Sequence, residues 1–422
     1  MKSLYIYNIF PRLAGKMSNW PAIALHARKL GFNSIYLNPF HETGLGDSLY
    51  AVKNYFKVDS AFHSQKSATG LEELQEIILQ IRQMGIKVIM DLVINHTAVN
   101  NPLTKTHPEW YRLDDNGKIL HPSAIDPADS RKITVWGDLY EIDNLTSKAG
   151  SELWNFWKGV IETYTLLGFR GFRADAAYKV PAQLWKLLVE HAQKIAGEKV
   201  YFLAETLGCR LEEVESLKEA DFDYLYNSSK YWNFDQNWAL QQHTEFQKIA
   251  PSVSFPESHD TLRLAKTAQK RTQVQKQRYA LALFFSKAVQ ITMGFEYGWT
   301  RKCNVVKSKV TSLEPETMDI TSFISRANKF AQETPLFNEE GSLEALSPFN
   351  QAVFILKKSS NYGKNPLYAF INKDWDQSQT IELDNQYKLM PLFRKPEGWQ
   401  LHPQGQLLLE PAEIVFGRKI NE

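Results

Sequence analysis

Eight short apolar runs, separated by longer helical patterns, constrain this chain more than any other feature of its sequence. The runs are Ser3–Asn8, Ser34–Asn38, Ile86–Val93, Gly171–Asp175, Val200–Glu205, Phe222–Tyr226, Ser252–Pro256 and Val289–Gly294. Near-continuous apolar runs are typical of parallel strands that are buried on both faces, and alternation with helices favours βα units. Eight of them predict a closed (β/α)8 barrel, an α/β fold of the TIM-barrel type.

Two segments depart from this alternation. Residues 97–147, after the third run, are rich in Asn, Pro, Asp and His, which predicts an inserted subdomain rather than a loop. After about residue 340 the pattern changes to short strands with turns, including Ala352–Lys357, Leu367–Asn372 and Thr380–Leu383. We therefore expect a barrel made of residues 1–96 and 148–340, an insertion at 97–147 and an antiparallel C-terminal β domain at 341–422.

The charge and the cysteine content of the chain favour some classes of function, and one cellular compartment, over others. The 49 basic and 47 acidic residues leave a net charge of +2, so no strong field would attract nucleic acid or an anionic membrane, and a neutral substrate fits better. Cys209 and Cys303 provide no disulfide framework, and the sequence contains neither a secretory signal pattern nor a long apolar run. We expect a cytoplasmic protein that binds neither membrane nor nucleic acid; the sequence indicates no oligomeric state.

Polar residues close four of the apolar runs. In a parallel barrel the active site lies at the C-terminal ends of the strands, so these residues are the first candidates for chemistry. They are Asp91, Asn95 and His96 after the third run, Arg173 and Asp175 in the fourth, Glu205 in the fifth, and Ser258, His259 and Asp260 after the seventh. Several carboxylates would then meet at one end of the barrel, where an unpaired buried charge is too costly to keep.

Such a set of acids suits chemistry at an acetal carbon. One carboxylate attacks the anomeric carbon, and a protonated carboxylic acid donates a proton to the departing oxygen. Arg173 lies two residues before Asp175 on the same strand face, where we expect its charge to keep Asp175 ionised. Apolar neighbours would raise the pKa of Glu205, and Asp91 is expected to be a buried anchor rather than a catalyst.

Four sequence strings, in this order and spacing, resemble the signature regions of the α-amylase superfamily of glycoside hydrolases. They are DLVINH (91–96), GFRADAAYK (171–179), AET (204–206) and SHD (258–260). The resemblance implies that Asp175 is the catalytic nucleophile and Glu205 the general acid/base. It also implies that Asp260 braces the distorted sugar and its developing positive charge.

The same resemblance implies a set of substrate-binding residues. Tyr50 would stack on the sugar, although Leu49 stands where the family usually has glycine, and Lys179 would lie near the leaving-group sugar. His96, Arg173 and His259 would form hydrogen bonds at the scissile glucose. Asn95 matches a position that binds calcium in some amylases, but one oxygen ligand is not a site, so we predict no metal and no cofactor.

Three functions remain open at this point. The first is hydrolysis of α-1,4-glucosidic bonds in maltooligosaccharides or glycogen-like glucans through a β-glycosyl-aspartate intermediate. The second is an α-glucan transferase, either a 4-α-glucanotransferase or a maltosyltransferase using maltose 1-phosphate, because Ser258 and the Thr-Leu-Gly after Glu205 look closer to intracellular branches of the family. The third is a non-catalytic amylase-like binding protein, which would have a broken acid set, whereas all three acids are present.

Overall fold

A closed barrel of eight parallel strands forms the centre of the protein. The computed structural model describes residues 3–63, 68–126, 129–146, 150–363, 365–394 and 398–420. Around the barrel the strand order is β1-β14-β13-β12-β11-β10-β5-β2. The strands are β1 Tyr5–Ile9, β2 Ser34–Leu37, β5 Lys87–Leu92, β10 Gly171–Ala174, β11 Tyr201–Ala204, β12 Tyr224–Tyr226, β13 Ser252–Ser254 and β14 Ala288–Thr292. Each overlaps one predicted apolar run, so the predicted barrel is confirmed.

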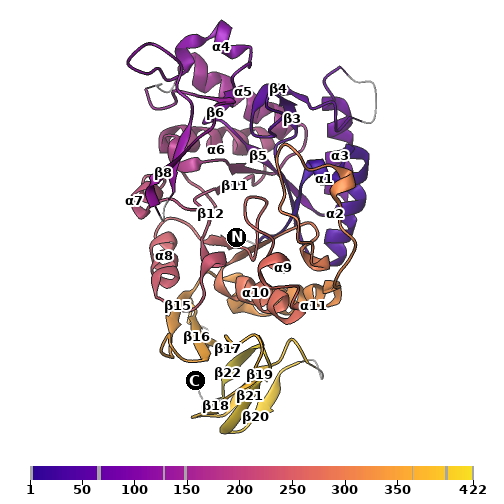
Figure 1. Ribbon diagram of the computed structural model, residues 1–422, viewed down its shortest axis with the longest axis vertical. Helices are drawn as coiled ribbons and strands as arrows, with labels where there is room; N and C mark the ends of the chain where they lie inside the picture. Colours follow the sequence, from indigo (N-terminus) through magenta and orange to yellow (C-terminus); the bar gives the residue numbers. More distant parts are fainter. Residues whose placement is uncertain are drawn as a thin grey trace.

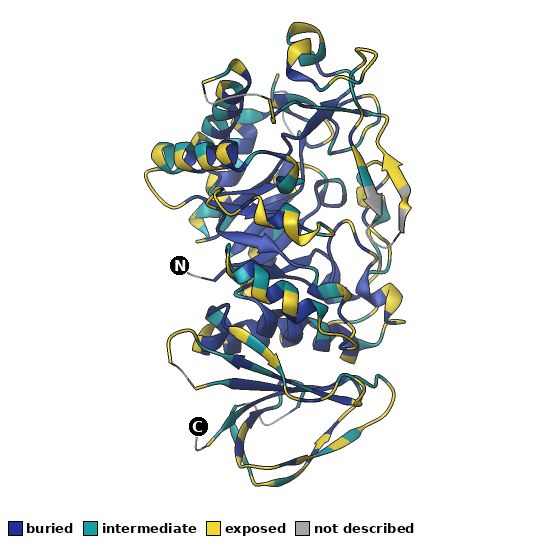
Figure 2. Cartoon of the chain, turned by 90° about the vertical axis from the view of Figure 1, so that its left-hand side faces the viewer, coloured by how far each residue is buried: buried dark blue, intermediate teal, exposed yellow. Residues whose placement is uncertain are grey.

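Helices surround the barrel and cover its strands (Figures 1 and 2). The longer ones are α2 Trp20–Lys29, α3 Leu71–Gln83, α5 Glu152–Leu166, α6 Ala182–Ala196, α8 Trp238–Gln247, α10 Thr272–Phe285 and α11 Thr321–Glu333. The shorter ones are α1 Pro11–Ala14, α4 Leu103–Thr106, α7 Leu211–Glu215 and α9 Leu264–Thr267.

Helix α5 shows how the sequence determines such an element. The Ser151 side chain accepts a hydrogen bond from the Trp154 amide, and an apolar stripe from Leu153 to Tyr164 is buried. Within the described ranges, no helix is both long and apolar enough to cross a bilayer.

Small antiparallel elements extend from the strand ends on one side of the barrel. Strands β3 His41–Thr43 and β4 Val52–Val58 pair after β2. In the segment after β5, β6 His96–Ala98 pairs with β9 Leu139–Glu141, and β7 Ser123–Asp126 pairs with β8 Asp129–Val135. Figure 1 shows β3, β4, β6 and α4 in the upper part of the molecule and β8 at its left-hand side. The predicted boundary between residues 147 and 148 lies outside the described residues.

The C-terminal region is an antiparallel β structure, as predicted. Its main sheet has the order β15-β16-β17-β22-β19-β20, and β18 pairs with β21. The strands are β15 Ser342–Ala345, β16 Val353–Ser359, β17 Leu367–Asn372, β18 Gln379–Leu383, β19 Tyr387–Met390, β20 Gln400–His402, β21 Gly405–Leu409 and β22 Ile414–Lys419. Phe416 of β22 stacks on Phe284 of α10 with ring centroids 5.3 Å apart, which joins this sheet to the barrel. The predicted residue boundaries of the three units stay a prediction.

A buried ion pair holds the segment between β13 and α9, which carries His259 and Asp260. Arg263 Nη1 lies 2.6 Å from Glu257 Oε1, and both side chains are almost fully buried. Glu257 Oε2 also accepts the Leu264 amide at 2.7 Å, while Arg263 Nη2 donates to the Met293 carbonyl at 3.0 Å. The pair therefore fastens this segment to the residue that follows β14.

We expect Glu257→Gln to lower the free energy of unfolding by about 3 to 5 kcal/mol, because it leaves the Arg263 cation buried without its counter-charge. Chemical denaturation followed by circular dichroism measures this loss. The matched control is Asp376→Asn, which breaks an ion pair with Arg271 whose side chains are 68% and 32% exposed. That control should change stability by less than about 1 kcal/mol. Equal effects of the two substitutions would contradict the prediction.

Candidate active site

The three predicted acids line one cavity at the C-terminal ends of the barrel strands. Asp175 directly follows β10, Glu205 directly follows β11, and Asp260 lies in the segment after β13. The cavity has a volume of about 520 Å³. Its wall is completed by Ser48, Tyr50, Asn95, His96, Pro122, Ser123, Ala124, Trp136, Asp138, Leu139, Ala176, Tyr178, Lys179, Val305 and Val306. The structure thus brings together acids that are far apart in the chain.

The buried guanidinium of Arg173 contacts carboxylates that belong to three strand ends. Its Nη1 lies 2.8 Å from Asp91 Oδ1 and 2.8 Å from Asp175 Oδ1, and its Nη2 lies 3.4 Å from Glu205 Oε2. Asp91, at the end of β5, is completely buried, as expected of an anchor. Buried carboxylates need a nearby counter-charge, and Arg173 supplies it to all three acids at once.

A second set of hydrogen bonds connects Asp91 to Asp260. Asp91 Oδ2 accepts hydrogen bonds from the Tyr36 hydroxyl at 2.5 Å and the Tyr50 hydroxyl at 2.6 Å. His259 Nε2 lies 2.6 Å from the Tyr50 oxygen and 2.9 Å from Asp260 Oδ2. Since an ionised Asp91 can only accept, the Tyr50 hydrogen points to Asp91, and His259 Nε2 must carry the hydrogen shared with Asp260. The ring of Tyr50 stacks on His259 at 5.8 Å.

Burial and Arg173 act in opposite directions on Asp175 and Glu205. Burial raises the pKa of both carboxyls, and the Arg173 charge lowers it. Burial outweighs Arg173 at Asp175, so the expectation that Arg173 alone keeps this residue ionised was too simple. The two acids titrate as a pair, and the shorter contact of Arg173 with Asp175 favours the charge there and the shared proton on Glu205.

Asp260 has a different electrostatic environment. Its side chain is 49% exposed within the cavity. Burial opposes ionisation, but the charge of His259 and its hydrogen bond outweigh burial and lower the pKa of Asp260 to about 2. Asp260 is therefore a carboxylate throughout the pH range in which the other two acids exchange a proton.

The remaining predicted residues gather around the same acids. His96 lines the cavity, and burial lowers its pKa to about 4, although a hydrogen bond with the Tyr50 backbone acts in the opposite direction. Its ring is therefore neutral near pH 7. Lys179 also lines the cavity, with Nζ 5.4 Å from the centre of the Tyr178 ring. Arg173 and His259 line a small adjoining pocket that shares Glu205 and Asp260 with the cavity.

Sequence reasoning missed much of the cavity wall. Trp136 and Asp138 come from the inserted segment, and Val305 and Val306 come from the segment after β14. None of these residues closes an apolar strand run, which was the signal used to find the acids. Tyr178 lies inside the string GFRADAAYK, so that motif could have identified it.

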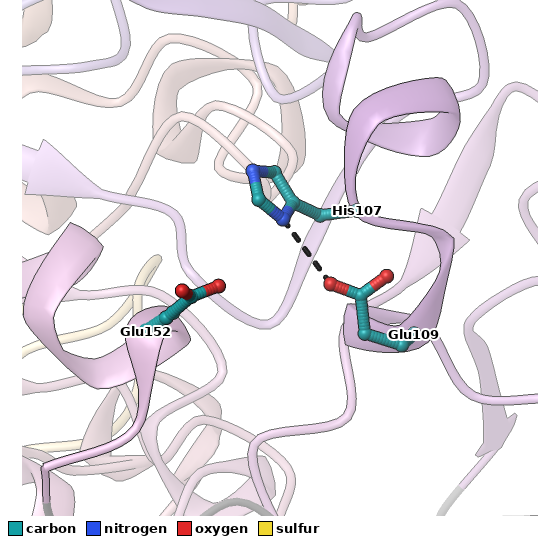
Figure 3. Close-up of side chains that lie close together, drawn as sticks. All are labelled: His107, Glu109 and Glu152. Atoms are coloured by element: carbon teal, nitrogen blue, oxygen red, sulfur yellow. Dashed lines mark hydrogen bonds and ion pairs between the residues drawn. The ribbon is translucent and has the colours of Figure 1, made fainter.

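No metal site accompanies these acids in the described parts of the chain. The Asn95 side chain lines the cavity and lies 3.4 Å from His96 Nδ1. The group with enough ligand atoms for an ion lies elsewhere and consists of His107, Glu109 and Glu152, with ligand atoms within 4.8 Å of one another (Figure 3). Glu109 and Glu152 are exposed, and exposed acids often cluster without an ion. This cluster therefore does not support a metal centre, and the absence of a metal stays a prediction.

Sequence comparisons relate this chain to known proteins. Residues 1–122 match the family model of the glycogen debranching enzyme, glucanotransferase domain. An α-1,4-glucan:maltose-1-phosphate maltosyltransferase of Burkholderia pseudomallei is 22% identical over 364 residues, which cover 84% of this chain and 31% of that protein. The chain thus spans about a third of the length of this curated relative.

Solved structures show the same fold over the whole chain. An α-amylase from Lactobacillus plantarum has a TM-score of 0.77 with 18% identity, covering 98% of both chains. An α-amylase from Geobacillus thermoleovorans, complexed with acarbose, has a TM-score of 0.76 with 16% identity, covering 99% of both chains. At these identities the structural likeness shows the fold. The sequence matches and the shared fold identify the chain as a distant homologue of maltosyltransferases and amylases, with the fold of the α-amylase family of glycoside hydrolases.

Proposed function

We propose that this protein is a retaining enzyme that hydrolyses α-1,4-glucosidic bonds of maltooligosaccharides or glycogen-like glucans. The observation that carries the proposal is the convergence of Asp175, Glu205 and Asp260 on one cavity, with Arg173 in contact with the first two. A non-catalytic binding protein would not need an acid pair held around a buried guanidinium. The complete set therefore favours catalysis.

The arrangement suits a two-step reaction with a covalent intermediate. Asp175 attacks the anomeric carbon while Glu205 donates its proton to the departing glycosidic oxygen, and a β-glycosyl-aspartate forms. Glu205 then removes a proton from water, and the oxygen of that water displaces Asp175. Asp260, which stays ionised, braces the sugar and stabilises the positive charge that develops on its ring.

The contacts of the carboxyl groups support these proposed roles. Arg173 favours the anion on Asp175, the residue that must attack, while Glu205 Oε2 accepts the Ala176 amide at 2.7 Å and is held in place beside it. The neutral ring of His96 and the exposed Lys179 both line the cavity, where they can contact sugar hydroxyls. Tyr50 and His259 are fixed against each other by the contact between the Tyr50 hydroxyl and His259 Nε2.

The charged side chains that line the cavity affect which glycosyl donor it can bind. Asp138, Asp175, Glu205 and Asp260 line it, and among the lining residues that the structure describes Lys179 is the single lysine or arginine. A dianionic sugar phosphate would meet repulsion here, whereas a neutral glucan would not. This favours an uncharged donor. A maltosyltransferase using maltose 1-phosphate is the second candidate, because the B. pseudomallei relative carries that name.

We expect Asp175→Asn to reduce glucan turnover by about 10³-fold or more, because the amide cannot form the glycosyl intermediate. Release of reducing sugar from maltoheptaose measures the loss, and circular dichroism should show an unchanged fold. Asp138→Asn is the matched control, since it makes the same change in the same cavity outside the Arg173 contacts, and it should stay within about tenfold of the parent. Equal losses in both variants would rule out the assigned nucleophile.

Glu205 should set the alkaline side of the pH profile. Its pKa is raised by burial, so the acid form persists above the ordinary glutamate value of about 4.3 and is lost as pH rises through the raised pKa. The alkaline fall of kcat/KM should therefore disappear in Glu205→Gln when the substrate is a 4-nitrophenyl α-glucoside, whose leaving group needs little protonation. Turnover of maltoheptaose should fall by about 10² to 10⁴-fold. An unchanged alkaline limb in this variant would contradict the assignment.

Product analysis separates hydrolysis from transfer. We expect maltoheptaose to give shorter free sugars, and added maltose 1-phosphate to leave the products unchanged, because acidic side chains outnumber basic ones among the described residues that line the cavity. Chromatography of the reaction with and without maltose 1-phosphate is the measurement. Glucans longer than the starting material, formed only when maltose 1-phosphate is present, would support the transferase instead.

A further inference from the structure

Three aromatic residues line the cavity, and two of them are already engaged. Tyr50 stacks on His259, and its hydroxyl is held by Asp91. The ring of Tyr178 lies beneath the Lys179 ammonium. Trp136 makes no ring stacking or cation contact with any residue in the described ranges. Neither face of its indole is covered by a ring or cation contact among the described residues, so a ligand in the cavity can stack on it.

The backbone around Trp136 is well anchored. Trp136 directly follows β8, its amide donates to the Pro122 carbonyl at 3.1 Å, and its carbonyl accepts the Leu139 amide at 3.2 Å. Its side chain is nevertheless 41% exposed. A large flat ring that is fixed at its backbone and exposed in a cavity wall provides apolar area that a ligand can cover, and an indole N–H that can reach a hydroxyl.

We propose that Trp136 is the platform on which a glucosyl unit next to the scissile one stacks, and that it gives the enzyme its preference for chains over single sugars. This inference rests on the proposed function. The scissile sugar belongs beside Tyr50, because the Tyr50 hydroxyl is part of the hydrogen-bonded set that holds Asp91 and Asp260. Among the described residues Trp136 makes no hydrogen bond or ring contact with that set, and it comes from the inserted segment, so we assign the sugar that it covers to a neighbouring position.

The chemistry of the two surfaces matches. A glucose ring has a face of C–H groups and a rim of hydroxyls, and indole pairs an apolar face with one polar edge. Asp138, two residues from Trp136 and on the same wall, accepts hydrogen bonds and can bind sugar hydroxyls. The floor of the cavity thus holds the reacting groups, while this part of the wall recognises an additional neutral sugar.

The test compares one long and one short substrate. Trp136→Ala should raise KM for maltoheptaose about tenfold with kcat nearly unchanged, because it removes binding that is equal in ground and transition states. For 4-nitrophenyl α-glucoside, which has a single glucosyl unit, KM and kcat should stay within about twofold. Trp136→Phe should restore most of the affinity for maltoheptaose. The control is Tyr362→Ala, which removes an aromatic side chain that is 78% exposed outside the cavity, and it should change neither substrate.

Two outcomes would overturn the role of Trp136. One is an unchanged KM for maltoheptaose in Trp136→Ala while the parent protein is active. The other is an equal loss on both substrates that Trp136→Phe does not restore, which would indicate a structural role. If the parent protein cleaves neither substrate, the proposed function itself fails, and the role of Trp136 falls with it.

Discussion

The contact of one buried arginine with three carboxylates is the interaction on which the site depends. Arg173 compensates the charge of Asp91 and lies against both Asp175 and Glu205. Without this cation, burial would protonate the acids or push them toward solvent. Asp91 then extends the arrangement by accepting hydrogen bonds from Tyr36 and Tyr50. The anchor of the site and its reacting groups are thus parts of one charged cluster.

The barrel makes this cluster possible because parallel strands bring their C-terminal ends to one face. Residues that follow β5, β10, β11 and β13 meet there, although they are far apart in the chain. The wall above them has a different origin. Trp136 and Asp138 come from the inserted segment, and Val305 from a loop after β14. The proposed chemistry therefore rests on residues at strand ends that packing holds rigid, and the proposed recognition of substrate rests on loops.

Much of the fold and of the acid set could be predicted, for identifiable reasons. Strands buried on both faces are continuously apolar, so each barrel strand can be recognised as an apolar run in the sequence. The acids lie at or shortly after the ends of these runs. The wall could not be found in this way, because Trp136 and Val306 lie in loops rather than at the end of an apolar run. The pKa of Asp175 could not be predicted either, because it depends on how deeply Asp175, Arg173 and Glu205 are buried together.

Local order along the chain was enough to determine the eight strands, the helices between them, the antiparallel C-terminal strands and the identity of the acids. These properties depend on side-chain periodicity and on which residues adjoin a strand, and both can be read from neighbouring positions. Only the tertiary structure decided that Arg173 contacts three acids, that His259 shares its proton with Asp260 and that Trp136 lies open in the wall. Those are relations between residues far apart in sequence, whose distances and burial exist only after the barrel has closed and the loops have packed against it.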